Sequence, residues 1–354
     1  MFSCKTCNTR ADEGRHENIS EHWEEKLFGE IGMQRARDYE IYDSLFEYPN
    51  GELGHIHTIE AGDVKLQPLV LIHGYGSGAI FYYKVIAELR HRFHIYSIDL
   101  NGMGSSARRP ITNFDFNHVV DFFVDALELW RIKIGLRDFV LMGHSMGGYI
   151  SGHWMRLKKP PVKLLYLLSP AGFTNKETTT FKGEKTLFMK GILAVLWQYL
   201  VQEWKFSPLS FLPGKIHSFR YYFKTRPLLN LPESECEILA KYLVSVLDKN
   251  ESGERAVGIL LNFARYSNYP ICQILHEIRH DQGFSYPIVV IYGERDWMDY
   301  EHSIEQNLAL DLRLDIIFIP NCDHQIILQN PSGLCHRMLQ DLDRGIENIH
   351  KVNR

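Results

Sequence analysis

The chain has 354 residues, 45% hydrophobic and 23% charged, which is ordinary for a soluble globular protein with a sizeable core. Its formal charge of -4 gives no reason to expect a nucleic acid partner, and no apolar run is long enough to span a bilayer. Residues 1–5 lack the apolar core of a signal peptide and the six cysteines are scattered, so we expect a cytoplasmic protein.

Residues 1–35 are predicted to form a tail with one short helix. Four apolar residues of this polar stretch fall on one helix face: Trp23, Leu27, Phe28 and Ile31. We favour packing of this face on the domain, and the alternative is a membrane-touching helix. Cys4 and Cys7 lack the second cysteine pair of a zinc site, and both palmitoylation and ordinary thiols stay open for them.

Residues 36–172 are predicted to be the first part of an α/β core. Alternating residues between 39 and 60 predict two antiparallel strands that meet at the turn Pro49-Asn50-Gly51. Buried strands are expected at 68–72, 93–98, 139–143 and 162–168, and helices at 80–89, 119–134 and after residue 145. Strands that alternate with helices give a mostly parallel sheet covered on both faces.

The sequence Gly143-His144-Ser145-Met146-Gly147 follows one of these strands and opens a helix. It fits the G-x-S-x-G turn, which holds a serine in a strained backbone conformation with an exposed hydroxyl. The glycines are needed because the chain reverses too tightly for a Cβ atom. Since the helix N-terminus faces any developing oxyanion, we predict Ser145 as a nucleophile.

A second glycine-rich turn, from His73 to Gly78, follows the strand at 68–72. It lacks the Lys-Ser/Thr ending of a phosphate-binding loop. In a hydrolase, the backbone N–H groups near Tyr75 and of Met146 would form an oxyanion hole. His73 and His144 adjoin glycines of the two turns, and we interpret both histidines as structural.

Three charged residues follow the strand at 93–98. Asp99 begins a glycine-rich turn, and we expect it to cap and order that loop rather than to act as an acid. Arg108 and Arg109 leave two interpretations. We favour a solvated surface pair over a contact with an anionic headgroup.

The alternation of strands and helices stops at residues 173–284, which are predicted to be an inserted helical cap. Helices are expected at 193–201, 233–247 and 255–265. The stretch from Leu187 to Leu212 is rich in aromatic and aliphatic residues, and part of it must be packing core. Whether the rest forms an acyl-binding wall or a membrane-facing surface stays open.

Residues 285–354 are predicted to complete the core, with strands at 287–292 and 313–319 and a closing helix from residue 331. Asp296 and Asp299 follow the first of these strands, and His324 follows the second. A serine nucleophile needs a base, and the base needs a group that holds its tautomer. We assign His324 as the base and Asp296 as the acid, with Asp299 as the alternative acid.

These motifs together resemble the α/β-hydrolase superfamily, whose triads run in the order Ser, Asp, His. More narrowly, the chain resembles the branch of α/β-hydrolase domain proteins 4 and 5, which contains lysophospholipid hydrolases or acyltransferases and lipase coactivators. The resemblance runs from about residue 20 to 345 and rests, besides the serine turn, on these sequences: His73-Gly74-Tyr75-Gly76-Ser77-Gly78, Asp99-Leu100-Asn101-Gly102-Met103-Gly104, Leu129-Trp130-Arg131, Gly293-Glu294-Arg295-Asp296-Trp297 and Asp323-His324.

Two positions separate this chain from parts of that branch. The coactivator members have lost the serine, whereas Ser145 is present, which favours an enzyme over a scaffold. The branch also carries an H-x-x-x-x-D motif linked to acyl transfer, and here Gln329 stands in place of the aspartate. This change weakens an acyltransferase interpretation and leaves His324 available as a base.

We therefore expect a serine esterase of lipase or lysophospholipase type that acts on a phospholipid or lysophospholipid. No metal and no cofactor are expected. The alternatives are a lysophospholipid acyltransferase and a non-catalytic regulator that binds protein partners through the cap. The expected partners are a lipid or other acyl ester and a peripheral membrane or lipid-droplet surface, and no nucleic acid.

Overall fold

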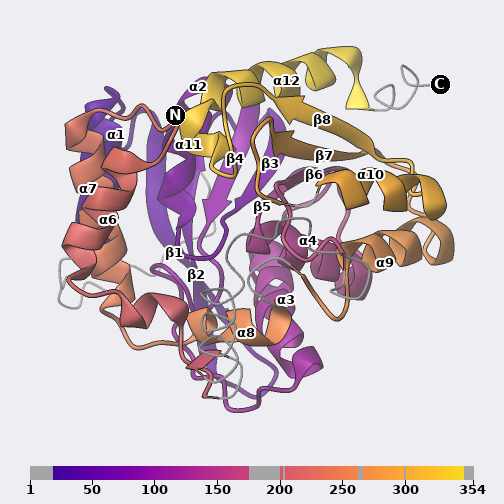
Figure 1. The fold of residues 1–354 in the computed structure, drawn as a ribbon, viewed down its shortest axis with the longest axis horizontal. Coiled ribbons are helices and arrows are strands. Elements are labelled where there is room, and N and C mark those ends of the chain that lie inside the picture. The colour runs from indigo at the N-terminus through magenta and orange to yellow at the C-terminus, as the bar shows by residue number, and fades with distance from the viewer. Residues whose placement is uncertain (1–18, 175–199, 202–203, 262–265, 299, 347–354) are drawn as a thin grey trace, which may run out of the picture.

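One mostly parallel sheet runs through the centre of the molecule (Figure 1). The computed structural model describes residues 19–174, 200–201, 204–261, 266–298 and 300–346. Eight strands of this part of the chain pair in the order β1-β2-β4-β3-β5-β6-β7-β8. β2 pairs antiparallel with β1 and β4, and all later pairings are parallel.

The strands lie where the sequence predicts them. Their bounds are β1 Tyr39–Glu47, β2 Leu53–Ala61, β3 Gln67–Ile72, β4 Phe93–Ile98, β5 Phe139–His144, β6 Val162–Leu168, β7 Ile288–Gly293 and β8 Asp315–Ile319. The last strand starts two residues later than expected, because Arg313 has a positive φ of 55° that does not fit a strand. The mostly parallel α/β sheet with helices on both faces is thus confirmed.

Helices cover both faces of the sheet. Because successive side chains of a strand point to opposite faces, Val70 and Ile72 belong to one core and Leu69 and Leu71 to the other. The first core includes α3 (Phe116–Lys133), α4 (Met146–Lys158), α8 (Val257–Leu260) and α9 (Ile271–His276). The second includes α1 (Ile19–Glu30), α2 (Tyr83–Leu89), α6 (Lys215–Thr225), α7 (Glu233–Leu247), α11 (Ile326–Gln329) and α12 (Pro331–Arg344).

Between β6 and β7 the described residues contain helices and irregular chain but no strand. α7 has the predicted bounds, whereas the helix expected at 255–265 does not continue through Leu261, and residues 262–265 lie outside the described residues. α8 ends at Leu260, and Leu261 is extended and packs beside Gly172, so tertiary packing overrides the local pattern there. The helix expected at 193–201 lies almost wholly outside the described residues.

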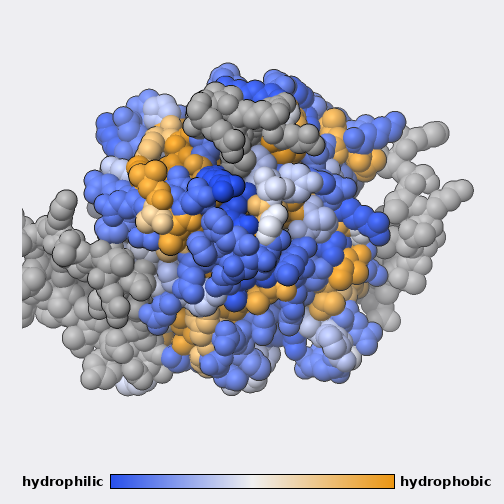
Figure 2. Space-filling view, turned by 90° about the vertical axis from the view of Figure 1, so that its right-hand side faces the viewer, coloured by the Kyte–Doolittle hydropathy of each residue, from blue (hydrophilic) through white to orange (hydrophobic). Residues whose placement is uncertain are grey.

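The described helices of the predicted cap contact different parts of the molecule. α6 and α7 lie beside α1, at the left in Figure 1, and α9 packs against α4. α10 (Tyr300–Ala309) lies next to α9, on a face that is mostly hydrophilic with separate hydrophobic patches (Figure 2). The residue limits of tail, core and cap stay predictions.

Helix α1 packs on the domain through the apolar face that the sequence predicts. Leu27 and Phe28 are buried, and Trp23 is half-buried with the ammonium of Lys241 4.9 Å from its ring. These contacts join α1 to α7. Cys4 and Cys7 lie outside the described residues. No helix in the described part of the chain is both long and apolar enough to cross a bilayer.

Candidate active site

Ser145 occupies the sharp turn between β5 and α4. Its φ of 54° and ψ of −119° lie in a region that strains a residue with a Cβ atom. Neighbouring backbone keeps the turn closed: a Cβ on Gly147 would lie 2.4 Å from the carbonyl oxygen of His73, and one on Gly143 would lie 2.5 Å from that of Gly147. The turn therefore has the backbone geometry that the G-x-S-x-G pattern predicts.

His324 follows β8 and faces Ser145. Its Nε2 lies 3.0 Å from Ser145 Oγ, and its Nδ1 lies 3.3 Å from Asp296 Oδ1. Since the ionised carboxylate only accepts, Nδ1–H donates to Asp296, which leaves Nε2 free to accept the Ser145 proton. The structure thus brings Ser145, His324 and Asp296 from the ends of three different strands into one hydrogen-bonded chain.

Asp296 is buried but remains a good acceptor. Burial on its own raises the pKa of the Asp296 carboxyl, but the hydrogen bond and charge of His324 outweigh it and lower that pKa. The hydroxyl of Ser169 donates to Oδ2 and the Met298 N–H donates to Oδ1 at 3.0 Å. The alternative acid, Asp299, lies outside the described residues, so the choice between the two acids stays a prediction.

Two rings pack against His324. His144 donates from Nε2 to the His324 carbonyl at 2.8 Å, with ring centroids 4.9 Å apart. Burial, and then the nearby His324, lower the pKa of His144 to about 3, so this ring is neutral. Trp297 lies 4.9 Å from the His324 ring and is 43% exposed. Sequence reasoning missed Trp297 and Ser169, although Trp297 directly follows the predicted acid.

The loop that carries Tyr75 passes close to Ser145. A Cβ on Gly74 would lie 2.9 Å from the Ser145 Cβ. Neither the Tyr75 N–H nor the Met146 N–H donates a hydrogen bond to a described residue, so both remain open to a ligand. The Tyr75 hydroxyl lies 2.7 Å from Ser207 Oγ, which ties this loop to the segment between β6 and β7.

Asp99 accepts hydrogen bonds from the loop that it begins and from the residue after the Tyr75 loop, and His73 bonds within the Tyr75 loop and to Leu100. The two carboxylate oxygens of Asp99 accept the N–H groups of Ala79 and Ser105, both at 2.7 Å. His73 donates from Nδ1 to the Gly74 carbonyl at 2.7 Å and accepts the Leu100 N–H at Nε2. Burial lowers the pKa of His73, which keeps this ring neutral and available as an acceptor.

Arg108 differs from both of its expected roles. Arg108 is largely buried and forms two hydrogen bonds with the carboxylate of Glu254, at 2.8 and 3.1 Å. Neither the solvated surface pair nor the headgroup contact is correct for Arg108. Arg109 forms an ion pair with Glu52 and stacks 3.8 Å from the Tyr48 ring. The two arginines therefore join segments of the chain.

One cluster in the described part of the chain has the residue types and spacing of metal ligands. Glu24, His57 and Asp99 place ligand atoms within 4.8 Å of one another. However, both His57 ring nitrogens already bond to carboxylates, of Glu24 at 3.0 Å and Asp43 at 2.9 Å. A protonated His57 donates to both carboxylates, so these two bonds need no metal ion.

Three comparisons with known proteins give consistent results. Residues 67–331 match the family described as alpha/beta hydrolase fold. The chain is 27% identical over 309 residues to a 1-acylglycerol-3-phosphate O-acyltransferase of Arabidopsis thaliana, covering 81% of this chain and 69% of the relative. It is 30% identical over 251 residues to a (lyso)-N-acylphosphatidylethanolamine lipase of Mus musculus, covering 68% and 69%.

Solved structures share the fold. A bacterial membrane phospholipase A superposes with a TM-score of 0.63 at 20% identity, covering 93% of this chain and 90% of the other. At this identity the likeness concerns the fold alone.

Proposed function

Because the chain belongs to the α/β-hydrolase family, we propose that it is a serine hydrolase that cleaves acyl esters with Ser145, His324 and Asp296. The observation that carries this proposal is the hydrogen-bonded chain from Ser145 Oγ through the His324 ring to the Asp296 carboxylate. A serine needs such a base, and the base needs such an acceptor, to attack an ester at neutral pH.

In the proposed reaction, Ser145 Oγ attacks the ester carbonyl while its proton moves to His324 Nε2. The Asp296 carboxylate holds the tautomer and faces the imidazolium that forms. The free N–H groups of Tyr75 and Met146, with the N-terminus of α4 behind Met146, stabilise the oxyanion. The Nε2 proton then passes to the leaving alcohol, and a water activated by His324 hydrolyses the acyl-enzyme.

We infer the substrate class from the names of the two relatives, a (lyso)-N-acylphosphatidylethanolamine lipase and a 1-acylglycerol-3-phosphate O-acyltransferase. Both names imply a glycerophospholipid, so the proposed substrate is a phospholipid or lysophospholipid. Acyl transfer is the second candidate, in which the hydroxyl of a lysophospholipid replaces water in the second step. A panel of lipid substrates, with and without a lysophospholipid acceptor, separates hydrolysis from transfer.

A non-catalytic regulator that binds protein partners through the cap is the rival from another class. A fluorophosphonate probe reacts only with an activated serine, so stoichiometric labelling supports an enzyme. The matched variant is Ser145→Ala, which removes the nucleophile and little volume. Absence of labelling in the wild-type protein favours the regulator.

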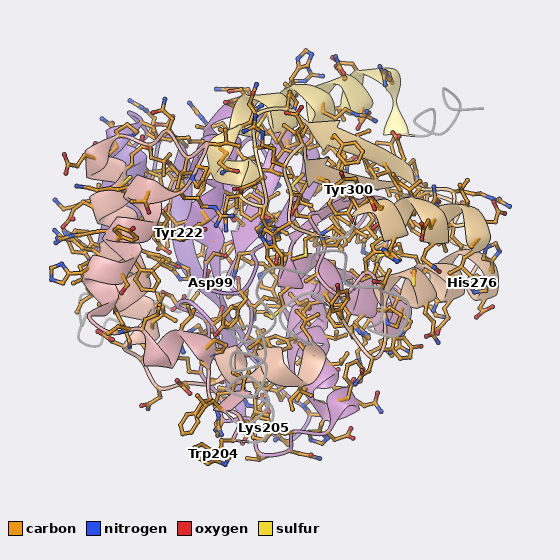
Figure 3. All side chains as sticks on the ribbon, in the orientation of Figure 1. Asp99, Trp204, Lys205, Tyr222, His276 and Tyr300 are labelled. Carbon is orange, nitrogen blue, oxygen red and sulfur yellow. The ribbon has the colours of Figure 1, made fainter. Side chains whose placement is uncertain are left out.

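We propose further that the enzyme works at a membrane or lipid-droplet surface. Trp204 and Phe206 support this proposal, because they are 62% and 42% exposed and lie next to each other with ring centroids 6.4 Å apart. Trp204 lies at the lower edge of the molecule, far from Asp99 at the centre (Figure 3). Exposed tryptophan is favourable at a lipid interface. Most of the stretch from Leu187 to Leu212, including Trp197, lies outside the described residues.

A further inference from the structure

The end of helix α6 is hydrogen-bonded to the residue that precedes His324. Arg226 directly follows α6, and its Nη2 donates to Asp323 Oδ1 at 3.0 Å. The side chains of this ion pair are 20% and 15% exposed, so water screens it only in part. The Arg226 guanidinium also lies 5.1 Å from the centre of the Tyr222 ring.

Gln329, five residues after His324, makes a second connection to the same helix end. Its Oε1 accepts the Asp323 N–H at 2.8 Å, while its Nε2 donates to the Pro227 carbonyl at 2.9 Å. An amide side chain can make both bonds, whereas an ionised carboxylate has no hydrogen to donate. Gln329 therefore joins the loop before His324 to the chain that follows α6.

Helix α6 itself is fixed to the core. Phe219 and Phe223 are buried, and Tyr222 lies on the inner side of the helix, toward the centre of the molecule (Figure 3). His324 lies in the loop between β8 and α11, outside any described strand or helix. The loop is also attached to the core, since the Arg295 N–H donates to the Cys322 carbonyl at 3.0 Å, and the end of α6 is a further support beside His324.

We propose that Arg226 and Gln329 are positioning residues, through which helix α6 holds His324 in register with Ser145. We call Arg226, Pro227, Asp323 and Gln329 the α6 bracket. The inference rests on the proposed function, because it assigns a role to the inserted segment in the same reaction. A shift of about 1 Å in a reacting group costs on the order of a hundredfold in rate, so each support of the loop beside His324 matters for catalysis.

The test uses the full chain and two bracket variants with a matched control. Gln329→Glu keeps the acceptor for the Asp323 N–H but loses the donor to Pro227. Arg226→Ala removes the ion pair to Asp323, and Arg226→Lys restores its charge. The control is Arg220→Ala, on the same helix, whose ion pair with Glu237 joins α6 to α7 and does not reach the His324 loop.

The readouts are kcat and KM for a soluble short-chain ester, the rate of fluorophosphonate labelling, and the melting temperature. We expect Gln329→Glu and Arg226→Ala each to lower kcat and the labelling rate by about tenfold or more, on the scale of a misplaced base. KM should stay within about twofold, because substrate binding does not depend on the base. Arg226→Lys should recover part of the loss, and Arg220→Ala should retain wild-type kcat.

The double variant adds a stringent test. If both side chains act through one bracket, the combined loss in Arg226→Ala/Gln329→Glu should be smaller than the product of the single losses.

Two results overturn the inference while the proposed function stands: bracket variants no slower than Arg220→Ala, or losses in kcat that follow the melting temperature in all variants alike. A wild-type protein that neither labels nor hydrolyses esters overturns the proposed function, and the inference falls with it.

Discussion

Ser145 owes its reactive geometry to the residues that crowd it. A Cβ on Gly74 would lie 2.9 Å from the Ser145 Cβ, and Gly147 lies against the carbonyl groups at the end of β3. Ser145 keeps its positive φ of 54° because this packing fixes the chain on both sides. Backbone contacts with the end of β3 thus maintain the strained conformation of Ser145.

Two glycines on α4 test this packing. Gly147→Ala places a Cβ 2.4 Å from the His73 carbonyl oxygen and 2.6 Å from that of Ile72, so backbone must move. We expect a loss of about 1–3 kcal/mol of stability, as for overpacked cores, and a fall in esterase activity. In Gly152→Ala the nearest atom is 3.5 Å away on the flexible side chain of Ile274, and helix propensity favours alanine. Urea unfolding of both variants should separate them, and equal stabilities would contradict the packing account.

Single asparagine substitutions identify the orienting acid. Asp296→Asn keeps the shape of the side chain but allows its amide to donate, so His324 is driven to the wrong tautomer. We expect a loss of about ten-thousandfold in kcat, with little change in melting temperature. Asp299→Asn should retain activity near wild type. A large loss in Asp299→Asn alone would move the acid to that position.

At the scale of elements, helix α1 is attached to the sheet by a buried ionic cluster. Glu24 of α1 and Asp43 of β1 bond to opposite nitrogens of His57, at 3.0 and 2.9 Å. Burial by itself lowers the pKa of His57, but the charge of Glu24 and the hydrogen bond to Asp43 outweigh it and hold that pKa well above 6.5. His57 is therefore a cation in the folded state.

This cluster predicts how stability depends on pH. Since the folded pKa of His57 is raised, its contribution is complete below about pH 6.5 and is lost as the pH rises through the folded pKa. His57→Gln should cost about 3 kcal/mol at pH 6, because it leaves the buried Glu24 carboxylate without a cation. Urea unfolding from pH 6 to 10 should show the wild type and the variant converge. A gap that is constant or widens with pH would contradict the ionic account.

The exposed aromatic pair before η4 (Pro208–Phe211) tests the membrane proposal. Trp204→Ser with Phe206→Ser should weaken binding to phosphatidylcholine vesicles and slow long-chain lipid hydrolysis, while a soluble short-chain ester reacts as before. Melting temperature should change little, because Trp204 and Phe206 are 62% and 42% exposed and neither belongs to the buried core. Tyr221→Ser, at a site 71% exposed on α6, is the matched control. Unchanged vesicle binding, or parallel loss of stability and short-chain activity, would defeat the membrane contact.

The strands and the serine turn could be predicted because their signals are local. Apolar runs such as 68–72 and 139–143 mark strands buried on both faces, and the glycines around Ser145 follow from a turn without room for a Cβ atom. The role of Arg108 could not be predicted, because its partner Glu254 lies 146 residues away. Ser169, which donates to Asp296, lies 127 residues from it, and the end of α8 depends on how Leu261 packs.

For the whole molecule, the segment between β6 and β7 is hydrogen-bonded to both loops of the proposed active site. Ser207 is hydrogen-bonded to Tyr75 in the proposed oxyanion loop, and Arg226 is hydrogen-bonded to Asp323 beside His324. Ser207 directly precedes η4 and Arg226 directly follows α6, so the two contacts lie on either side of these helices. This segment thus contacts the proposed oxyanion loop and also the loop that carries the proposed base.

The central claim is that Ser145 is an activated nucleophile, and intact-mass spectrometry after reaction with a fluorophosphonate probe tests it most directly. The wild-type chain should gain one probe mass, and peptide mapping should place it on Ser145. Ser145→Ala should gain none, keep its melting temperature and lose ester hydrolysis by about a millionfold, as for other catalytic serines. An unlabelled wild-type protein, or a Ser145→Ala variant that still hydrolyses esters, would contradict the claim.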